Sequence, residues 1–205
     1  MIYGVTMVRD EADIIGYTLR HMLDQVDHVI VLDNRSVDET PAILAEVAQE
    51  TGRVTLVSDQ EPGYYQDDKM TMAAHTAWQM GARWVVPFDA DEAWYHLDYL
   101  RSAAAEDADV VTARPFVFVP QPGDDPDQLD PIARILWRVS TPEPHPKVAF
   151  RAHPHARVHM GNHGVDGVGH RVHHHRLGCR HYQFRSLDQL RRKIRNGMEA
   201  YTAAG

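Results

Sequence analysis

The sequence predicts an α/β protein whose central sheet is mostly parallel, with a more antiparallel C-terminal half. Over the first 95 residues, short apolar runs rich in β-branched side chains alternate with segments of helical periodicity. Parallel strands that helices cover on both faces are apolar almost throughout, as these runs are. The chain has 205 residues, 43% of them hydrophobic and 24% charged, which is typical of one globular domain. We therefore expect a single domain over residues 1–205, formed by two halves, 1–95 and 96–205.

Each expected element has local signals of its own. A proline suits the first turn of a helix over residues 38–50, and Gly52 suits the position just past its end. Ser186 and Gln189 resemble a capping box, and Gly197 is expected to end the helix that they begin. The other expected helices cover residues 11–24, 66–80 and 97–105. The expected strands cover residues 2–8, 28–32, 54–57, 83–88, 110–119, 135–139, 147–150 and 157–159. Residues 120–131 and 170–175 are expected to be loops.

Composition excludes several classes of protein. No run approaches the roughly 18–20 apolar residues that cross a bilayer, so no membrane span is expected. Charged residues stand at positions 9–11, where a signal peptide is apolar. The single cysteine, Cys179, excludes an internal disulfide and a cysteine-based zinc site. These features favour a cytoplasmic protein. The formal net charge of −8 argues against nucleic acid as a partner.

Charge is distributed unevenly along the chain. Residues 1–144 carry 10 Lys and Arg against 26 Asp and Glu, whereas residues 145–205 carry 11 against 3. Ten of the 14 histidines lie between His145 and His181. A basic segment that folds back onto an acidic one can form a local pocket for a phosphate-bearing small molecule beside a cation.

Polar residues follow each strand expected in the first half. Ligands of open α/β sheets bind at the carboxyl ends of the strands, so these residues are the candidates for a site. They are residues 9–11, 33–36, 59 onward and 89–92. The chain has neither the Gly-x-Gly-x-x-Gly of dinucleotide enzymes nor the Gly-rich loop with Lys-Ser/Thr of P-loop proteins. Both classes are therefore excluded.

Asp89 and Asp91 form the clearest candidate site. They are two residues apart at the end of a strand, so in extended geometry both carboxylates point to the same side. Hard oxygen ligands suit Mg²⁺ or Mn²⁺, which leave coordination positions for phosphate oxygens of a substrate. A solvated acidic turn is the alternative interpretation of the same residues.

Three motifs in order resemble a known family. They are Met-Val-Arg-Asp-Glu at residues 7–11, Val-Leu-Asp-Asn-Arg-Ser-Val-Asp-Glu-Thr at 31–40 and Trp-Val-Val-Pro-Phe-Asp-Ala-Asp-Glu at 84–92. Together they resemble the landmarks of family 2 nucleotide-sugar glycosyltransferases with the GT-A fold. The likeness extends to His-Tyr-Gln-Phe-Arg-Ser at 181–186 and to Gly-Asn-His-Gly-Val at 161–165, which are similar to segments of bacterial members.

The resemblance implies a metal-dependent enzyme that moves a sugar from a nucleoside diphosphate sugar, of UDP or GDP type, to an unknown acceptor hydroxyl, with inversion. Residues 1–95 would bind the nucleotide, and residues 96–205 would close over the metal and the acceptor. The implied metal ligands for Mg²⁺ or Mn²⁺ are Asp89, Asp91 and His181. The implied donor-binding residues are Val8, Arg9, Glu11, Asp33, Arg35, Gln66, Lys69 and Asp89. Asn34, Arg35 and Ser36 replace the commoner Asp-Gly-Ser, so the contact with the base can differ.

An inverting transfer needs a base that takes the proton of the acceptor hydroxyl. The Glu-Asp pair that often serves in this family is absent, so Asp166 and His163 are the candidates, with Glu143 as a third. Trp94 and Tyr95 are candidates for stacking on a sugar, although such aromatic residues commonly pack in a core.

Two alternative functions stay open from the sequence. A nucleotidyltransferase uses a similar sheet and metal, but it would carry a Gly-rich basic loop after the first strand, where this chain has Arg9-Asp10-Glu11. A non-enzymatic metal-binding module is suggested by the histidines, and it would bind Zn²⁺ or Ni²⁺ through residues 153–175.

Overall fold

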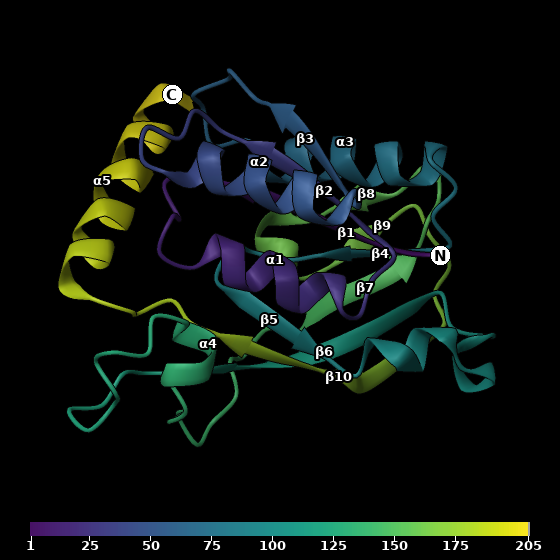
Figure 1. Cartoon of the computed structure of the whole chain (residues 1–205). Coiled ribbons are helices and arrows are strands. Elements are labelled where there is room, and N and C mark those ends of the chain that lie inside the picture. Colours follow the sequence, from purple (N-terminus) through teal and green to yellow (C-terminus); the bar gives the residue numbers. More distant parts are fainter. Residues whose placement is uncertain (205) are drawn as a thin grey trace.

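The computed structural model describes residues 1–204, and its centre is a mixed sheet of eight strands (Figure 1). The strands run in the spatial order β3-β2-β1-β4-β7-β6-β10-β5. Their bounds are β1 (Ile2–Val8), β2 (His28–Asp33), β3 (Val54–Ser58), β4 (Trp84–Pro87), β5 (Glu92–Tyr95), β6 (Val110–Val117), β7 (Lys147–Arg151) and β10 (Val172–His181). A small second sheet pairs β8 (Arg157–Val158) with β9 (Val165–Asp166).

The direction of the strands changes across the sheet as predicted. β3, β2, β1 and β4 are parallel to one another, whereas β7 is antiparallel to both β4 and β6. β10 is parallel to β6, and β5 closes the edge antiparallel to β10. The predicted α/β class, with a parallel N-terminal part and a more antiparallel C-terminal part, is confirmed and is consistent with a GT-A-like fold.

Helices cover both faces of the parallel part. The α-helices are α1 (Ile15–Leu23), α2 (Thr40–Thr51), α3 (Gln66–Gln79), α4 (Pro131–Arg134) and α5 (Leu187–Ala204), and the 3₁₀ helices are η1 (Leu97–Arg101), η2 (Ala103–Ala105) and η3 (Met160–Asn162). Side chains of β1 alternate between two cores: Ile2 packs in the core that contains α1, and Val5 packs in the core that contains α3. Burial on both faces explains why the strand is apolar at successive positions.

Local signals correctly predicted the end of α2 and the start of α5. Gly52 adopts a left-handed conformation, with φ 62°, just past the end of α2, and its N–H donates to the carbonyl oxygen of Ala48. At the start of α5, the N–H of Gln189 donates to Ser186 Oγ over 3.1 Å, and Gln189 Oε1 accepts from the N–H of Arg185. The expected cap at Ser186 is therefore confirmed.

Other predicted elements were wrong. Gly197 does not end the last helix, because α5 continues to Ala204; an interior glycine costs a helix only about 1 kcal/mol. Residues 135–139 form no strand in the described chain and contribute one isolated bridge, between Phe118 and Arg138. The helix expected from residue 11 begins at Ile15.

The sequence patterns missed three strands, β5, β9 and β10. Residues 172–175 were expected to be a loop but belong to β10: Val172 and His173 pair with β6, and pairing resumes at Leu177 after a shift in register. Most side chains of this segment are exposed. β5 was also not predicted, and Trp94 within it is fully buried, so this ring packs in the core and does not stack on a sugar. Tyr95 packs beside His21 and Arg180.

None of the helices within residues 1–204 combines the length and the apolar character that a membrane span requires.

Candidate active site

A pocket of about 390 Å³ lies at the carboxyl ends of β1, β2 and β4. Figure 1 shows α5 on the side of the sheet toward which β1 runs from the N-terminus. The pocket lies between these strand ends and α5. Its lining residues are Met7, Val8, Arg9, Asp10, Glu11, Asn34, Tyr64, Gln66, Asp89, Ala90, Asp91, Glu143, Lys147, Gly161, His163, His181, Gln183, Gln189, Lys193, Asn196, Gly197, Ala200 and Tyr201.

The segment after β1 is fixed by a strained aspartate. Asp10 is buried and has a positive φ of 55°, a region that Asp tolerates better than most residues. Its Oδ1 accepts from the N–H of Val37 over 2.7 Å, and its Oδ2 accepts from Asn196 Nδ2 over 2.7 Å. Arg9 forms an ion pair with Glu199 of α5 over 2.8 Å. The turn after β1 is thus tied to β2's loop on one side and to α5 on the other.

The loop after β2 places only one of its predicted side chains at the pocket. Asn34 lines the pocket and donates from Nδ2 to Asp59 Oδ2 over 2.8 Å. Asp33 accepts from the N–H of Ser36 and does not line the pocket, and Arg35 is exposed with a φ of 60°. The predicted contacts of Asp33 and Arg35 with a donor stay predictions.

Gln66 and Lys69, at the start of α3, lie in different surroundings. Gln66 lines the pocket and donates from Nε2 to Asp89 Oδ1 over 3.3 Å. Lys69 is buried away from the lining, where its Nζ pairs with Asp59 Oδ2 over 2.7 Å and donates to the carbonyl oxygens of Glu61 and Gly63. In this arrangement Lys69 fixes the loop before α3.

The first aspartate after β4 belongs to a network around Lys147. Lys147 Nζ lies 2.8 Å from Asp89 Oδ2 and 2.7 Å from Glu92 Oε1. Glu92 is fully buried, and burial raises its pKa while the Lys147 charge opposes that rise. Asp89 Oδ1 also accepts from Asn162 Nδ2 over 2.9 Å. Lys147 therefore neutralises both carboxylates and joins β7 to the end of β4.

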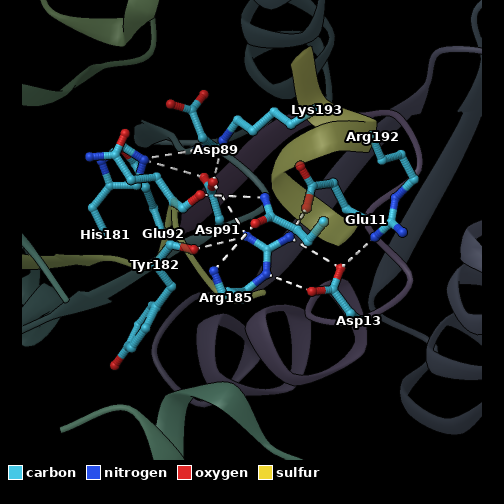
Figure 2. A network of polar contacts seen from close by, with 12 residues as sticks. Glu11, Asp13, Asp89, Asp91, Glu92, His181, Tyr182, Arg185, Arg192 and Lys193 are labelled. Atoms are coloured by element: carbon cyan, nitrogen blue, oxygen red, sulfur yellow. Dashed lines mark hydrogen bonds and ion pairs between the residues drawn. The ribbon is translucent and has the colours of Figure 1, made fainter. Parts of the chain in front are cut away.

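The second aspartate, Asp91, is surrounded by cations (Figure 2). Its side chain is 3% exposed, and its Oδ2 lies 2.6 Å from Lys193 Nζ and 3.5 Å from Arg185 Nη1. Although burial alone would raise the pKa of Asp91, the charges of Lys193, His181 and Arg185 hold it well below its usual range. Asp91 is therefore a carboxylate at neutral pH.

Arg185 links Asp91 to the turn after β1. Its guanidinium pairs with Glu11 and with Asp13, the latter over 2.7 Å, and it donates to the carbonyl oxygen of Tyr182 (Figure 2). Burial, together with the nearby charge of Asp91, raises the pKa of Glu11 to about 7, against the opposing effect of Arg185. The site thus contains a carboxyl group that titrates near neutral pH.

His181 and Asp91 have a donor set that suits a divalent cation. His181 Nε2 lies 3.5 Å from Asp91 Oδ1, and two ligands of one ion with bonds of about 2.1 Å lie roughly 3–3.5 Å apart. On its other side, His181 Nδ1 lies 2.9 Å from Glu143 Oε1. A carboxylate in this position fixes the ring of a metal-binding histidine. Two of the three predicted ligands therefore lie together.

Asp89, the third predicted ligand, is held by other partners. Its oxygens contact Lys147, Asn162 and Gln66. Within residues 1–204, no three His, Cys, Asp or Glu side chains form a group that could hold an ion. A metal at Asp91 and His181 would therefore depend on oxygens of a ligand for its remaining positions.

The candidates for the base lie in different places. His163 lines the pocket, and its Nδ1 lies 3.0 Å from the carbonyl oxygen of Pro146, so Nδ1 carries the proton and Nε2 is the free acceptor. Burial lowers the pKa of His163, which favours the neutral ring. Glu143 also lines the pocket but is engaged by His181. Asp166 does not line the pocket; its side chain is 76% exposed and pairs with His159 over 3.0 Å.

Comparison with known proteins identifies the chain's relatives. The family model described as glycosyl transferase family 2 matches residues 5–156, which is most of the chain and includes Asp89 and Asp91. The chain belongs to glycosyl transferase family 2. In this family 2 protein, the predicted metal ligand His181, at the end of β10, lies outside the matched range.

Individual relatives are more distant. A TPR repeat-containing protein of Synechococcus elongatus is 38% identical over 86 residues, which are 42% of this chain and 19% of that protein. The match thus spans about a fifth of the relative's length. A mannosyltransferase, PcManGT from Pyrobaculum calidifontis in complex with GDP-Man and Mn²⁺, is 25% identical, with a TM-score of 0.43, and the match covers 59% of this chain and 36% of that one. A 4-diphosphocytidyl-2C-methyl-D-erythritol synthase from Anaerococcus prevotii is 12% identical, with a TM-score of 0.44, and the match covers 74% and 71% of the two chains.

Three cations of the family 2 site were missed by sequence reasoning. Lys147 and Lys193 each pair with an aspartate of the Asp-Ala-Asp motif, and Arg185 pairs with Glu11 and Asp13. The available signals were the excess of basic residues after position 144 and, for Arg185, its place in the family-like segment at residues 181–186. Pairings across about 60 to 170 residues have no local pattern, so the sequence did not predict which basic side chain meets which acid.

Proposed function

We propose that this family 2 protein transfers a sugar from a nucleoside diphosphate sugar, of UDP or GDP type, to an acceptor hydroxyl. One observation carries the proposal: in a chain of this family, Asp91, His181 and predicted donor-binding residues line a single pocket at the carboxyl ends of parallel strands. Those donor-binding residues are Val8, Arg9, Glu11, Gln66 and Asp89. A pocket at this edge is where open α/β sheets bind ligands.

The proposed donor lies with its base and ribose near the end of β1 and its diphosphate near Asp91. Arg9 and Glu11 adjoin the base and the ribose, and Gln66 with Asp89 faces the ribose. The pocket volume, about 390 Å³, is in the range of small-molecule sites, roughly 300–1,000 Å³. Asp33, Arg35 and Lys69 belong to the predicted donor site, with Lys69 acting through the loop that it fixes.

We include a divalent cation, Mg²⁺ or Mn²⁺, in the proposal. Asp91 and His181 would hold it, with Glu143 orienting His181 through Nδ1. When bound, such an ion neutralises charge that develops on a departing diphosphate. Lys193 now occupies the other oxygen of Asp91, so this lysine must share that carboxylate or turn away when the ion binds.

His163 is the proposed base for an inverting transfer. Its ring lines the pocket, is held through Nδ1 by a backbone carbonyl oxygen and keeps Nε2 free to take a proton. Asp166 is the weaker candidate because it lies outside the lining. The buried, unpaired Cys179 is compatible with the proposed cytoplasmic location, where thiols stay reduced.

Nucleotide binding with and without metal tests the proposal. UDP, GDP and their sugars are added to the protein with Mn²⁺, Mg²⁺ or EDTA, and the melting temperature is measured. We expect one nucleotide series to raise it only in the presence of the ion, since a ligand at 100 times its dissociation constant contributes about 2.7 kcal/mol.

The matched variants are Asp91→Asn at the site and Asp98→Asn on the exposed surface of η1. Asp91→Asn is expected to abolish the metal-dependent shift, and Asp98→Asn to keep it. An unchanged shift in Asp91→Asn would rule out the proposed metal site. Absence of any nucleotide shift in the wild-type protein would rule out the proposed donor.

A further inference from the structure

The last helix, α5, turns a polar side toward the pocket. Gln189, Lys193 and Asn196 line the pocket together with Gly197. The apolar residues Leu187, Ile194 and Met198 lie on the other side, with exposures between 56% and 71%. At 100° per residue these two sets fall on opposite faces of one helix. α5 therefore contacts the molecule through this face, to which the buried Ala200 also belongs.

Contacts of this polar face reach both ends of the pocket. Asn196 Nδ2 donates to Asp10 Oδ2, and Arg192 Nε donates to the carbonyl oxygen of Asp10 over 3.1 Å. The N–H of Tyr64 donates to the carbonyl oxygen of Ala200 over 3.1 Å. Because the pocket is lined by α5 and still has a volume of about 390 Å³, the helix forms a wall of the pocket and does not fill it.

Arg185 and Lys193 both contact Asp91 Oδ2, and their side chains differ in exposure and in the number of their contacts (Figure 2). The side chain of Arg185 is 1% exposed and is fixed by Glu11, Asp13 and a backbone carbonyl oxygen. The side chain of Lys193 is 43% exposed and lines the pocket. Lys193 can therefore turn toward a ligand without leaving a buried guanidinium or carboxylate unpaired, since Arg185 and His181 remain on Asp91.

A diphosphate in this pocket needs positive charge beside it. The lining includes the acids Asp10, Glu11, Asp89, Asp91 and Glu143, and like charges at close range disfavour binding by several kcal/mol. Of the cations that line the pocket, Lys147 is held between two carboxylates and Arg9 pairs with Glu199. Lys193 is left as the cation next to Asp91 that is partly solvated and able to move.

We propose that Lys193 binds the diphosphate of the sugar donor, so that α5 supplies a donor-binding residue from outside the part of the chain that matches the family model. The inference rests on the proposed function. A lysine ammonium on a flexible stem suits phosphate oxygens, to which it donates charge-assisted hydrogen bonds. Its present contact with Asp91, at 2.6 Å, keeps the ammonium at the position from which it reaches the ligand.

Isothermal titration separates this role from a purely structural one. The titrants are UDP and GDP, each with the matching nucleoside monophosphate, and the variants are Lys193→Ala, Lys193→Arg and the control Arg191→Ala. Arg191 is on the same helix but 71% exposed, and it pairs only with Asp188 among the described ion pairs. Melting temperatures establish that each variant folds.

We expect Lys193→Ala to weaken diphosphate binding about tenfold or more, as loss of a charge-assisted hydrogen bond does. The effect on the monophosphate is expected to be smaller. Lys193→Arg is expected to recover most of the affinity, and Arg191→Ala to bind as the wild type does.

Two results of the titration would overturn the inference. If Lys193→Ala binds the diphosphate as tightly as the wild type, or more tightly, the lysine only closes the empty pocket and the inference is wrong. In that case the wild type still binds the nucleotide and the proposed function stands. If the wild type binds no nucleoside diphosphate and no sugar nucleotide, the proposed function fails and the inference fails with it.

Discussion

Lys193 and Asp91 are 102 residues apart in the sequence, yet the ammonium nitrogen lies 2.6 Å from a carboxylate oxygen of a side chain that is almost completely buried. The contact joins the last helix to the end of β4. Asp91 also contacts Arg185 and His181, but Arg185 pairs in turn with Glu11 and Asp13, and His181 with Glu143. Among the ion pairs of the described residues, Lys193 is the cation of these three that pairs with Asp91 alone, so it is the one available to a polyanionic ligand.

Glu11 predicts a specific dependence of stability on pH. Burial and the charge of Asp91 raise its pKa from 4.5 to about 7, although Arg185 and Lys193 oppose the rise. Since the folded-state pKa lies above the unfolded one, the contribution of protonated Glu11 to stability is present below about pH 4.5 and is lost as the pH rises through 7. Glu11→Gln cannot ionise, so it should gain stability relative to the wild type between these values.

Urea unfolding of both proteins at several pH values checks this expectation. A difference in unfolding free energy that stays constant from pH 4.5 to 8 would contradict it.

His181 predicts proton release when a metal binds. Burial opposes its charge, but Asp91 and the hydrogen bonds to Asp91 and Glu143 raise the pKa of His181 to about 11. The stability from this proton is complete below pH 6.5 and is lost as the pH rises toward 11. A metal needs the neutral ring, so Mn²⁺ affinity should increase with pH and binding should release about one proton.

Calorimetry of Mn²⁺ binding in two buffers with different ionisation enthalpies measures that proton. His181→Gln should remove most of the pH dependence, whereas equal heats in both buffers for the wild type would show that His181 is not a ligand.

Replacement of Lys147 is expected to lower the stability of the protein strongly. Its ammonium is nearly buried and neutralises Asp89 and the fully buried Glu92. Lys147→Met should cost about 3–5 kcal/mol, because it leaves a buried carboxylate without its partner. Adding Glu92→Gln should recover part of that loss. Arg20→Met, which breaks pairs with the exposed Glu46 and Glu50, should cost less than about 1 kcal/mol. Denaturant unfolding that gives equal losses for both single variants would contradict the assigned role.

Gly197 and Gly52 predict opposite effects of the same substitution. Gly197 lies inside α5, and a Cβ there would meet no atom within 4 Å, so Gly197→Ala should stabilise the protein by about 0.5–1 kcal/mol. Gly52 has a left-handed φ of 62° at the end of α2, so Gly52→Ala should destabilise by about 1–2 kcal/mol, although space is also free. Thermal unfolding distinguishes them, and a destabilised Gly197→Ala would show that the helix is not formed around this residue.

Variants of His163 and Asp166 distinguish the two candidates for the base. With water as the acceptor, release of the nucleoside diphosphate from its sugar is measurable before the natural acceptor is known. His163→Gln should lower this rate by about 10²–10⁴-fold, in the range of general base catalysis, with little change in donor affinity. Asp166→Asn should leave the rate unchanged because its side chain is exposed and outside the lining. The reverse ranking would move the base to Asp166.

The sequence predicted the parts of this protein that depend on local pattern. Apolar runs gave β1 and β2, and Gly52 marked the end of α2, because burial and backbone conformation act on neighbouring residues. Polar residues at strand ends gave the pocket edge, including Asp91. β5 and β10 were missed because their pairing partners are distant in sequence, and because β5 is only 4 residues long and β10 consists largely of His and Arg.

Residue order alone therefore determined the α/β class, the family motifs and the acidic edge of the site, since each rests on short-range periodicity or on a contiguous motif. Only the tertiary structure decided which cation meets which acid. Folding brings Lys147 to Asp89, Arg185 to Glu11, and Lys193 to Asp91. These ion pairs depend on the three-dimensional path of β7, β10 and α5, because charge interactions act through space and leave no periodic signal along the chain.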